Sequence, residues 1–311
     1  MIVVSGEALM DVFDQGRTGT GHTLDARMGG SPLNVAIGLA RLGQPVRFFG
    51  GVSRGFLGER LMSAMNQEGV DTCLVQRTEA PTTLSLVGVR PSGVPDYAFY
   101  SHGAAESQLP LSALEAIETA IPSAQAYHFG SYAMVIEPAG STLRALVVRE
   151  HGRSVIAYDP NVRTNVEPDL ARWREVIDWM APLTHLFKAS EEDLALLYPD
   201  VALADLAAAW LEAGASLVVI TRGAVGAEAW SAAGHVRAEP IRVEVVDTVG
   251  AGDTFQAMLL AALNEQGLLT PDAIRGLTRA QMAYILRLAS RAAAVTCSRR
   301  GADLPRRLEV D

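Results

Sequence analysis

The stretch DTVGAGDTF at residues 247–255 decides the fold of this chain. It follows an apolar stretch, which we expect to be the end of a strand, and leads into an almost wholly apolar stretch, which we expect to be a helix from about 254 to 266. Gly250 and Gly252 lack a Cβ atom, so the turn between them can bend tightly and lie against a ligand. The first amides of the helix and the positive end of its dipole would point into this turn. The stretch therefore predicts an anion site that suits a phosphate group.

Asp253 places a carboxylate beside the same turn, where it could accept a proton from an attacking hydroxyl. The alternative is that Asp253 is only the N-cap of the helix, a position that Asp favours. Two other phosphate motifs are excluded. The chain contains no Gly-Lys pair of a Walker loop, and Phe255 stands where a dinucleotide fingerprint has its third glycine.

The composition is that of a soluble globular enzyme, with 311 residues of which 49% are hydrophobic and 20% are charged. A net charge of −9 without a basic run argues against nucleic acid as the main partner. Cys73 and Cys297 are far apart, and the six histidines are scattered. Neither a disulfide framework nor a thiolate or histidine metal site is indicated.

The first residues, IVVSGEALMD from position 2, read as a core strand rather than a signal peptide. No apolar run approaches the roughly 20 residues that cross a bilayer. We therefore expect a cytoplasmic protein without a membrane partner.

Lys188 is the only lysine, since 25 of the 26 basic residues are arginine. One interpretation is coding bias with a single exception. The other is that arginine cannot replace a compact ammonium group at this position.

The first half of the chain begins with a predicted strand at 2–4, followed by a turn at 6–11. After Gly29 and Gly30, Ser31 is expected to be the N-cap of a helix with Pro32 at its first position, and the helix should stop at Gly43. A strand at 46–49 and a helix at 58–68 follow.

The second half alternates between strands and helices. We expect strands at 126–129, 155–158, 183–187 and 217–221, and helices at about 110–120, 138–150, 170–180 and 201–213. This alternation predicts a mostly parallel sheet with helices on both faces. Weakly alternating residues at 14–27 and a hairpin at 82–100, with the loop PSGVP, predict further strands outside that sheet.

Ligands of such sheets collect where the strands end. This rule brings together, along one edge, Asp11, Gly130, Asp159, Lys188, Thr221 and the turn at 247. The stretch TRGAVG at 221–226 could present amides and a hydroxyl to nucleotide phosphates. The stretch KASEED at 188–193 could hold Mg²⁺ through water, or could be a helix start with acidic residues in its first turn.

A small polyol needs fixed polar groups, and such groups cluster early in the chain. Asp11, the backbone of Gly29 and Gly30, and Asn34 could bind vicinal hydroxyls. Asn34 is unfavourable inside a helix, which favours a role for its side chain.

These residues together resemble a known family. DTVGAGDTF and the earlier GGSPLNVAIGLARLG at 29–43 look like the two signatures of the PfkB (ribokinase-like) carbohydrate kinases, and the resemblance covers essentially the whole chain. The stretches GEALMD, FFGGVSRGFLGERL, IEP, DPNVR, KASEEDL, TRGAVGA and CSRRGA look most like the bacterial fructokinase branch.

The resemblance implies a single domain, 1–311, with a three-layer αβα sandwich and a small β lid formed by about 12–28 and 82–101. Such lids are often shared in a homodimer. It also implies roles for individual residues. Asp253 would be the catalytic base beside an anion hole formed by the amides of Gly250, Ala251 and Gly252.

Further positions follow from the same resemblance. Asp11, Gly30 and Asn34 would contact the sugar; Thr221, Gly223 and Gly226 would lie against the ATP phosphates; and Glu191 would organise Mg²⁺. Lys188, which we assign to the nucleotide site, takes a place where ribokinases often carry Asn. Asp247 and the loop around Gly301 resemble a site for a monovalent cation such as K⁺.

The expected reaction is ATP-dependent phosphorylation of fructose at its 6-hydroxyl. One departure concerns the sugar: where fructokinases commonly carry an arginine after the lid, this chain has Gly103, Ala104, Ala105, Glu106 and Ser107. Arg163 in DPNVR is shared with 2-keto-3-deoxygluconate kinases and suits a substrate carboxylate, which makes that activity the alternative. A sugar-binding protein without catalysis and a Rossmann-type dehydrogenase are the hypotheses from other classes.

Overall fold

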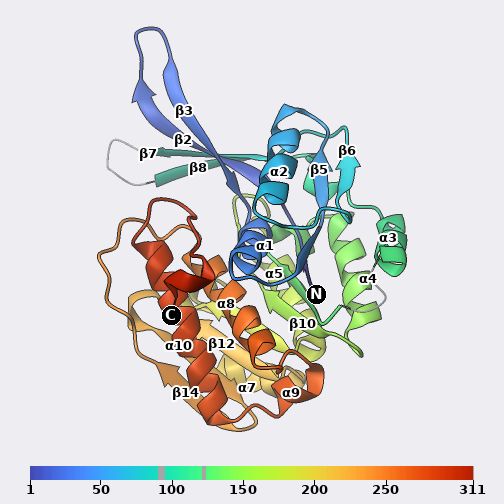
Figure 1. Ribbon diagram of the computed structural model, residues 1–311, viewed down its shortest axis with the longest axis vertical. Helices are drawn as coiled ribbons and strands as arrows, with labels where there is room; N and C mark the ends of the chain where they lie inside the picture. The colour runs from blue at the N-terminus through green and yellow to red at the C-terminus, as the bar shows by residue number, and fades with distance from the viewer. Residues whose placement is uncertain (90–94, 121–123, 311) are drawn as a thin grey trace.

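The computed structural model describes residues 1–89, 95–120 and 124–310 (Figure 1). Its centre is an eight-stranded sheet in the order β14-β13-β12-β11-β10-β9-β1-β4. The strands are β1 (Ile2–Ser5), β4 (Val46–Phe49), β9 (Ala126–Gly130), β10 (Val155–Asp159), β11 (Leu186–Ser190), β12 (Leu217–Thr221), β13 (Ala227–Ser231) and β14 (Gly234–Ala238). The strands from β4 to β12 are parallel, and β13 and β14 run antiparallel at one edge.

Helices cover both faces of this sheet. One apolar core contains residues of α1 (Ser31–Arg41), α2 (Phe56–Gln67), α8 (Ala251–Glu265), α9 (Pro271–Arg275) and α10 (Arg279–Cys297). The other contains residues of α3 (Leu114–Ala120), α4 (Ala139–Glu150), α5 (Leu170–Met180), α6 (Glu191–Leu197) and α7 (Leu203–Ala213). Within β1, Ile2 and Val4 face the first core and Val3 faces the second, as the alternation of a strand requires. The expected three-layer αβα sandwich is confirmed.

A separate four-stranded sheet, which we call the second sheet, has the order β3-β2-β7-β8. Its strands are β2 (Leu9–Arg17), β3 (His22–Gly29), β7 (Leu84–Val89) and β8 (Pro95–Tyr100). The hairpin of β2 and β3 projects beyond the rest of the molecule (Figure 1). The expected hairpin at 82–100 is present as β7 and β8, although residues 90–94 of its loop lie outside the described residues. A short pair, β5 (Gly51–Ser53) and β6 (Gln76–Thr78), lies apart from both sheets.

Several predicted boundaries were wrong, and the strand expected directly before the turn at 247–255 is absent, because the chain from 239 to 246 is irregular. Asp11 lies within β2 and pairs in register with Arg27, whereas we expected a turn. The strand predicted at 183–187 begins at Leu186, because a 3-10 turn at Ala181–Leu183, with Pro182 inside it, follows α5. Asp11 therefore comes from the second sheet and not from the edge of the central one.

Two helix starts also differ from the prediction. The N-cap of α1 is Gly30, with a φ of 103°, and not Ser31. Helix α8 begins at Ala251 and not at about 254, because Gly250 takes the left-handed conformation, with a φ of 79°, that a glycine N-cap permits. In both helices a glycine with a positive φ stands at the N-cap, directly before the first helical residue. Within the described residues, no helix combines the length and apolar character needed to cross a membrane.

Candidate active site

Asp253 lies in the first turn of α8, and its carboxylate is held by two side chains of α1. The hydroxyl of Ser31 donates to Oδ1 at 2.6 Å, and Nδ2 of Asn34 donates to Oδ2 at 2.8 Å. No side chain caps α8, whose N-cap is Gly250. The N-cap alternative for Asp253 is therefore wrong, and the carboxylate is aimed across the helix pair instead.

The start of α1 explains why Ser31 and Asn34 act together. They are three residues apart, so their side chains lie on the same face of the helix. Gly30 turns the chain into α1, and a Cβ atom at Gly30 would lie 2.8 Å from the carbonyl oxygen of Glu7. The sequence analysis assigned Ser31 to a cap and Asn34 to the sugar, so it missed their shared contact with Asp253. The spacing of Ser and Asn within GGSPLN was the available signal.

Asp11 lies near enough to Asp253 and Arg163 for their charges to act on its carboxyl group. Burial raises the pKa of Asp11, the guanidinium of Arg163 lowers it, and the charge of Asp253 raises it further. A Cβ atom at Gly29 would lie 2.1 Å from Oδ2 of Asp11, so the carboxylate occupies the space that this glycine leaves. The structure thus brings Asp11, Gly29, Gly30, Asn34 and Arg163 to one place.

Arg163 is exposed, and its guanidinium donates to the carbonyl oxygen of Val162 at 2.9 Å. Its charge also lowers the pKa of Glu7. Among the described residues, no carboxylate forms an ion pair with it. Arg163 is therefore available to an anionic group of a ligand.

Lys188 lies directly beneath the turn. Its ammonium donates to Oδ2 of Asp159 at 2.6 Å, and both side chains are buried. A Cβ atom at Gly252 would lie 3.3 Å from Nζ. Burial raises the pKa of Asp159, and the ammonium opposes that shift. The single lysine thus places a positive charge under the glycine amides that we assigned to the anion hole.

The segment TRGAVG begins with Thr221, the last residue of β12. At Gly223, with a φ of 49°, a Cβ atom would meet no other atom within 4 Å, so the loop is open there. At Gly226 a Cβ atom would lie 2.2 Å from the carbonyl oxygen of Ala238, which explains this glycine by backbone contact alone. The hydroxyl of Thr221 donates to the carbonyl oxygen of Ala189 at 3.4 Å, a long contact that a ligand could replace.

Glu191 is the first residue of α6, which Ser190 caps. Its Oε1 accepts from Nε of Arg222 at 3.1 Å, and its side chain is 38% exposed. The described residues contain no cluster of three acidic, histidine or cysteine side chains that could form a protein cage for a metal. One accessible carboxylate fits Mg²⁺ bound mainly by water and phosphate.

Asp247 ties the turn to the loop at residues 299–303. Its Oδ1 accepts from the amide of Val249 at 3.1 Å, and its Oδ2 accepts from the amide of Gly301 at 2.8 Å. A Cβ atom at Gly250 would lie 2.7 Å from Cβ of Ala302. Asp247 therefore fixes the position of the turn, and a cation at this place stays a prediction.

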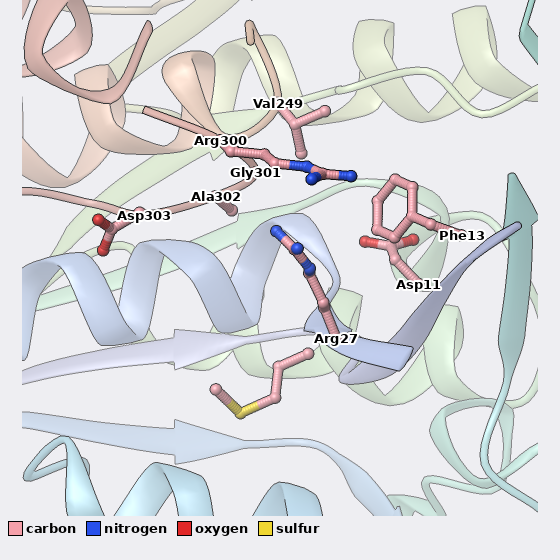
Figure 2. A pocket seen from close by; sticks show the side chains of 9 residues that line it. Asp11, Phe13, Arg27, Val249, Arg300, Gly301, Ala302 and Asp303 are labelled. Carbon is pink, nitrogen blue, oxygen red and sulfur yellow. The ribbon is translucent and has the colours of Figure 1, made fainter. Parts of the chain in front are cut away.

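A cavity of about 180 Å³ lies between the second sheet and loop 299–303 (Figure 2). It is lined by Asp11, Phe13, Arg27 and Met28 of the second sheet and by Val249, Arg300, Gly301, Ala302 and Asp303. Of these residues, the sequence analysis had singled out Asp11 alone as a site residue and Gly301 as part of a possible cation loop.

The stretch after the second sheet contains a buried acid. Glu106 lies in a 3-10 turn at Ala105–Ser107, where it accepts hydrogen bonds from Thr83 and from the hydroxyl of Tyr132. Burial raises its pKa. Ser107 is also buried and donates to the carbonyl oxygen of Ala104 at 2.7 Å. This stretch therefore supplies no arginine to the site.

Comparison with known proteins identifies the family. The family model described as pfkB family carbohydrate kinase matches residues 1–307. The chain belongs to this family. It is a carbohydrate kinase, an enzyme that transfers a phosphoryl group to a hydroxyl of a sugar.

Relatives of this carbohydrate kinase include several fructokinases. A fructokinase of Rhizobium leguminosarum bv. trifolii is 37% identical over 277 residues, which cover 89% of this chain and 84% of the relative. Probable fructokinase-4 of Arabidopsis thaliana is 30% identical, with 91% and 86% covered. The crystal structure of a fructokinase from Xylella fastidiosa with bound ATP has a TM-score of 0.89 at 26% identity, with 99% and 96% covered.

Proposed function

We propose that this kinase transfers the γ-phosphoryl group of ATP to the primary 6-hydroxyl of fructose, with Asp253 as the general base. The observation that carries the proposal is the position of Asp253, held by Ser31 and Asn34 beside the glycine turn and next to Asp11. The fructokinases among the relatives support fructose as the acceptor.

The proton transfer follows from this geometry. The sugar hydroxyl donates to the carboxylate of Asp253 and gives up its proton as its oxygen attacks the γ-phosphorus. The bond from that phosphorus to the bridging oxygen breaks, and the electron pair leaves with ADP. Phosphoryl transfer depends mainly on in-line positioning and on stabilising charge on the transferring oxygens. A carboxylate fixed by two donors meets the first requirement.

The turn and its surroundings would meet the second requirement, which is to stabilise charge on the transferring oxygens. The amides of Gly250, Ala251 and Gly252 at the start of α8 would receive the transferring phosphoryl oxygens. The ammonium of Lys188 lies just beneath them and adds positive charge. Thr221, Gly223 and Gly226 would line the path of the remaining ATP phosphates. The bound ATP of the Xylella fructokinase supports the choice of nucleotide.

Two ions belong to the proposal. Glu191 would hold Mg²⁺ through water, and the ion would neutralise charge on the ATP phosphates. Asp247 would lie near a K⁺ ion, whose effect would reach the turn through the bonds of Asp247 to Val249 and Gly301.

The sugar would lie between the central and second sheets. Asp11, Gly29, Gly30 and Asn34 would contact its hydroxyls, although Asn34 also serves Asp253. The second sheet would form the lid of a single domain, with the lid at about 12–28 and 82–101, and it would close over the sugar and exclude water. We propose that the enzyme is cytoplasmic and forms a homodimer through this lid.

A second candidate is phosphorylation of 2-keto-3-deoxygluconate. Arg163 favours it, because its exposed guanidinium lies near Asp11 and no described carboxylate pairs with it. A guanidinium in that position suits a substrate carboxylate. The missing arginine after the second sheet also weakens the case for fructose.

An assay of ADP release with MgATP tests both candidates. The panel should contain fructose, ribose, 2-keto-3-deoxygluconate and nucleosides, with and without K⁺. The proposal predicts the highest kcat/KM with fructose. Turnover with the acid sugar alone would replace fructose by the second candidate, and sugar binding without turnover would favour a non-catalytic sugar-binding protein.

A further inference from the structure

Two arginines face each other across the cavity between the second sheet and loop 299–303. Arg27 lies on β3, and Arg300 lies on the loop that follows α10. Figure 2 shows both guanidinium groups pointing into the space between the sheet and the loop, and the carboxylate of Asp303 pointing away from them. The two positive charges come from parts of the chain that are far apart in sequence.

Arg27 is held in place by its own strand pair. Its Nε and Nη2 donate to Oδ2 of Asp25 at 2.8 and 2.7 Å, and its guanidinium carbon lies 5.7 Å from the centre of the Phe13 ring. The third nitrogen faces the loop, since a Cβ atom at Gly301 would lie 2.9 Å from Nη1. Arg27 therefore presents Nη1 to the cavity in a fixed orientation.

Arg300 has one long polar contact, from Nη2 to Oε1 of Gln15 at 3.4 Å. Among the described residues, no carboxylate forms an ion pair with it. The neighbouring Asp303 is already engaged, because Arg41 and Arg299 bind its carboxylate. Most of the donors of Arg300 are therefore available to a ligand in the cavity.

The same cavity borders the transfer site. Asp11, which we place at the sugar hydroxyls, and Val249, which belongs to the turn, both line it. An acceptor that contacts Asp11 would therefore bring its substituents within reach of Arg27 and Arg300. Neither arginine has a role in the function proposed above.

We infer that Arg27 and Arg300 form an anion subsite for a charged group carried by the sugar, either a phosphate monoester or a carboxylate. This inference rests on the proposed function, because it assigns the cavity to the sugar of the kinase reaction. Fructose itself carries no charge, so the anion is either the phosphate of the product or the carboxylate of an acid sugar. Paired guanidinium groups suit both anions, since their planar donors match phosphate and carboxylate oxygens. Arg27 comes from the second sheet and Arg300 from the loop, so the subsite is complete only when the two lie together. A bound anion would therefore favour contact between the second sheet and the loop.

Titration calorimetry without nucleotide tests the subsite. The probes are fructose, fructose 6-phosphate and gluconate, titrated into the wild type and the variants Arg27→Met and Arg300→Met. Each variant should lose about tenfold or more in affinity for at least one anionic probe, because hydrogen bonds to charged groups are lost. The affinity for fructose should fall far less. Loss for the phosphate marks a product subsite, and loss for gluconate marks a charged acceptor.

Arg17→Met on β2 and Arg306→Met after the loop serve as controls, because both residues lie outside the cavity lining. They should bind all probes as the wild type does. The inference fails if no anionic probe binds the wild type, if the variants lose neutral and anionic sugars equally, or if they lose neither. An ADP-release assay without turnover on any sugar would instead refute the proposed function and leave the binding result intact.

Discussion

Asn34 and Asp253 are joined by a hydrogen bond of 2.8 Å across 219 positions of the chain. With Ser31, Asn34 fixes the orientation of the carboxylate that we propose as the base. The contact joins the starts of α1 and α8, the two segments that carry the family signatures. The two signatures therefore form one structural unit around a single carboxylate.

Replacing Ser31 or Asn34 by alanine should lower kcat more than it raises KM for ATP. Each change removes a hydrogen bond to a carboxylate, and we expect a loss of about 10- to 100-fold in kcat. Steady-state kinetics of the single variants measures this effect. Ser63→Ala on an exposed part of α2 is the control. If both variants kept wild-type kcat, the orientation of Asp253 would not limit the reaction.

Replacing Asp253 by asparagine should abolish most of the turnover while sparing ATP binding. An amide keeps the shape of the side chain but cannot accept the proton, so kcat should fall by about 10² to 10⁴. ADP-release kinetics together with ATP titration separates the two effects. Asp272→Asn, on an exposed side chain of α9, is the matched control. Near-normal turnover of the Asp253 variant would refute its role as base.

Lys188 can be tested for catalysis apart from folding. Lys188→Met leaves Asp159 buried without its partner, which should destabilise the protein by about 3–5 kcal/mol. The double variant Lys188→Met with Asp159→Asn removes both charges and should recover much of the lost Tm. It should not recover kcat, because the charge beneath Gly252 is still missing.

Recovery of both Tm and kcat in the double variant would mean that Lys188 is structural. Lys188→Arg is a complementary test, since a planar guanidinium is not a substitute for a compact ammonium. It should raise KM for ATP. Unchanged kinetics would favour coding bias as the explanation for the single lysine.

Glu7 should make stability depend on pH. Burial raises the pKa of Glu7 from 4.5 to about 8, so the folded protein keeps a proton that the unfolded chain releases. The resulting stabilisation is complete below pH 4.5 and is lost as the pH rises toward 8. Glu7→Gln should remove this contribution, whose slope is at most about 1.4 kcal/mol per pH unit.

Denaturant unfolding between about pH 5 and 8.5 measures the difference in the free energy of unfolding between the wild type and the variant. This range covers most of the interval over which the pKa of Glu7 is shifted. Relative to the wild type, Glu7→Gln should gain stability as the pH rises. Glu79→Gln, whose side chain is 88% exposed, should follow the wild type. A Glu7 variant with the pH dependence of the wild type would show that this proton is not held in the folded protein.

Most of the central sheet could be predicted from the sequence. Short apolar runs at 126–129, 155–158 and 217–221 lie between predicted helices. This pattern is typical of parallel strands that are buried on both faces. Helix α10 was not predicted, although its Thr278 and Gln281 form a capping box. Its three arginines and scattered small residues hide the apolar stripe that packs on α8.

The sequence predicted individual segments of the site but not the contacts between them. Glycine spacing and the acid after it pointed to the turn at 247–255, because these features are local. The link of Ser31 to Asp253, the pair of Lys188 and Asp159, and the cavity with Arg27 and Arg300 all join distant segments. Such contacts depend on how helices and strands pack, which no local pattern contains.

The central claim is transfer of a phosphoryl group from ATP to the 6-hydroxyl of fructose. An assay with MgATP and fructose, coupled to an isomerase and a dehydrogenase that together detect fructose 6-phosphate but not fructose, measures that transfer directly. We predict that fructose 6-phosphate appears in a one-to-one ratio with ADP. ADP release without fructose 6-phosphate, or no ADP release with fructose at all, would contradict the account.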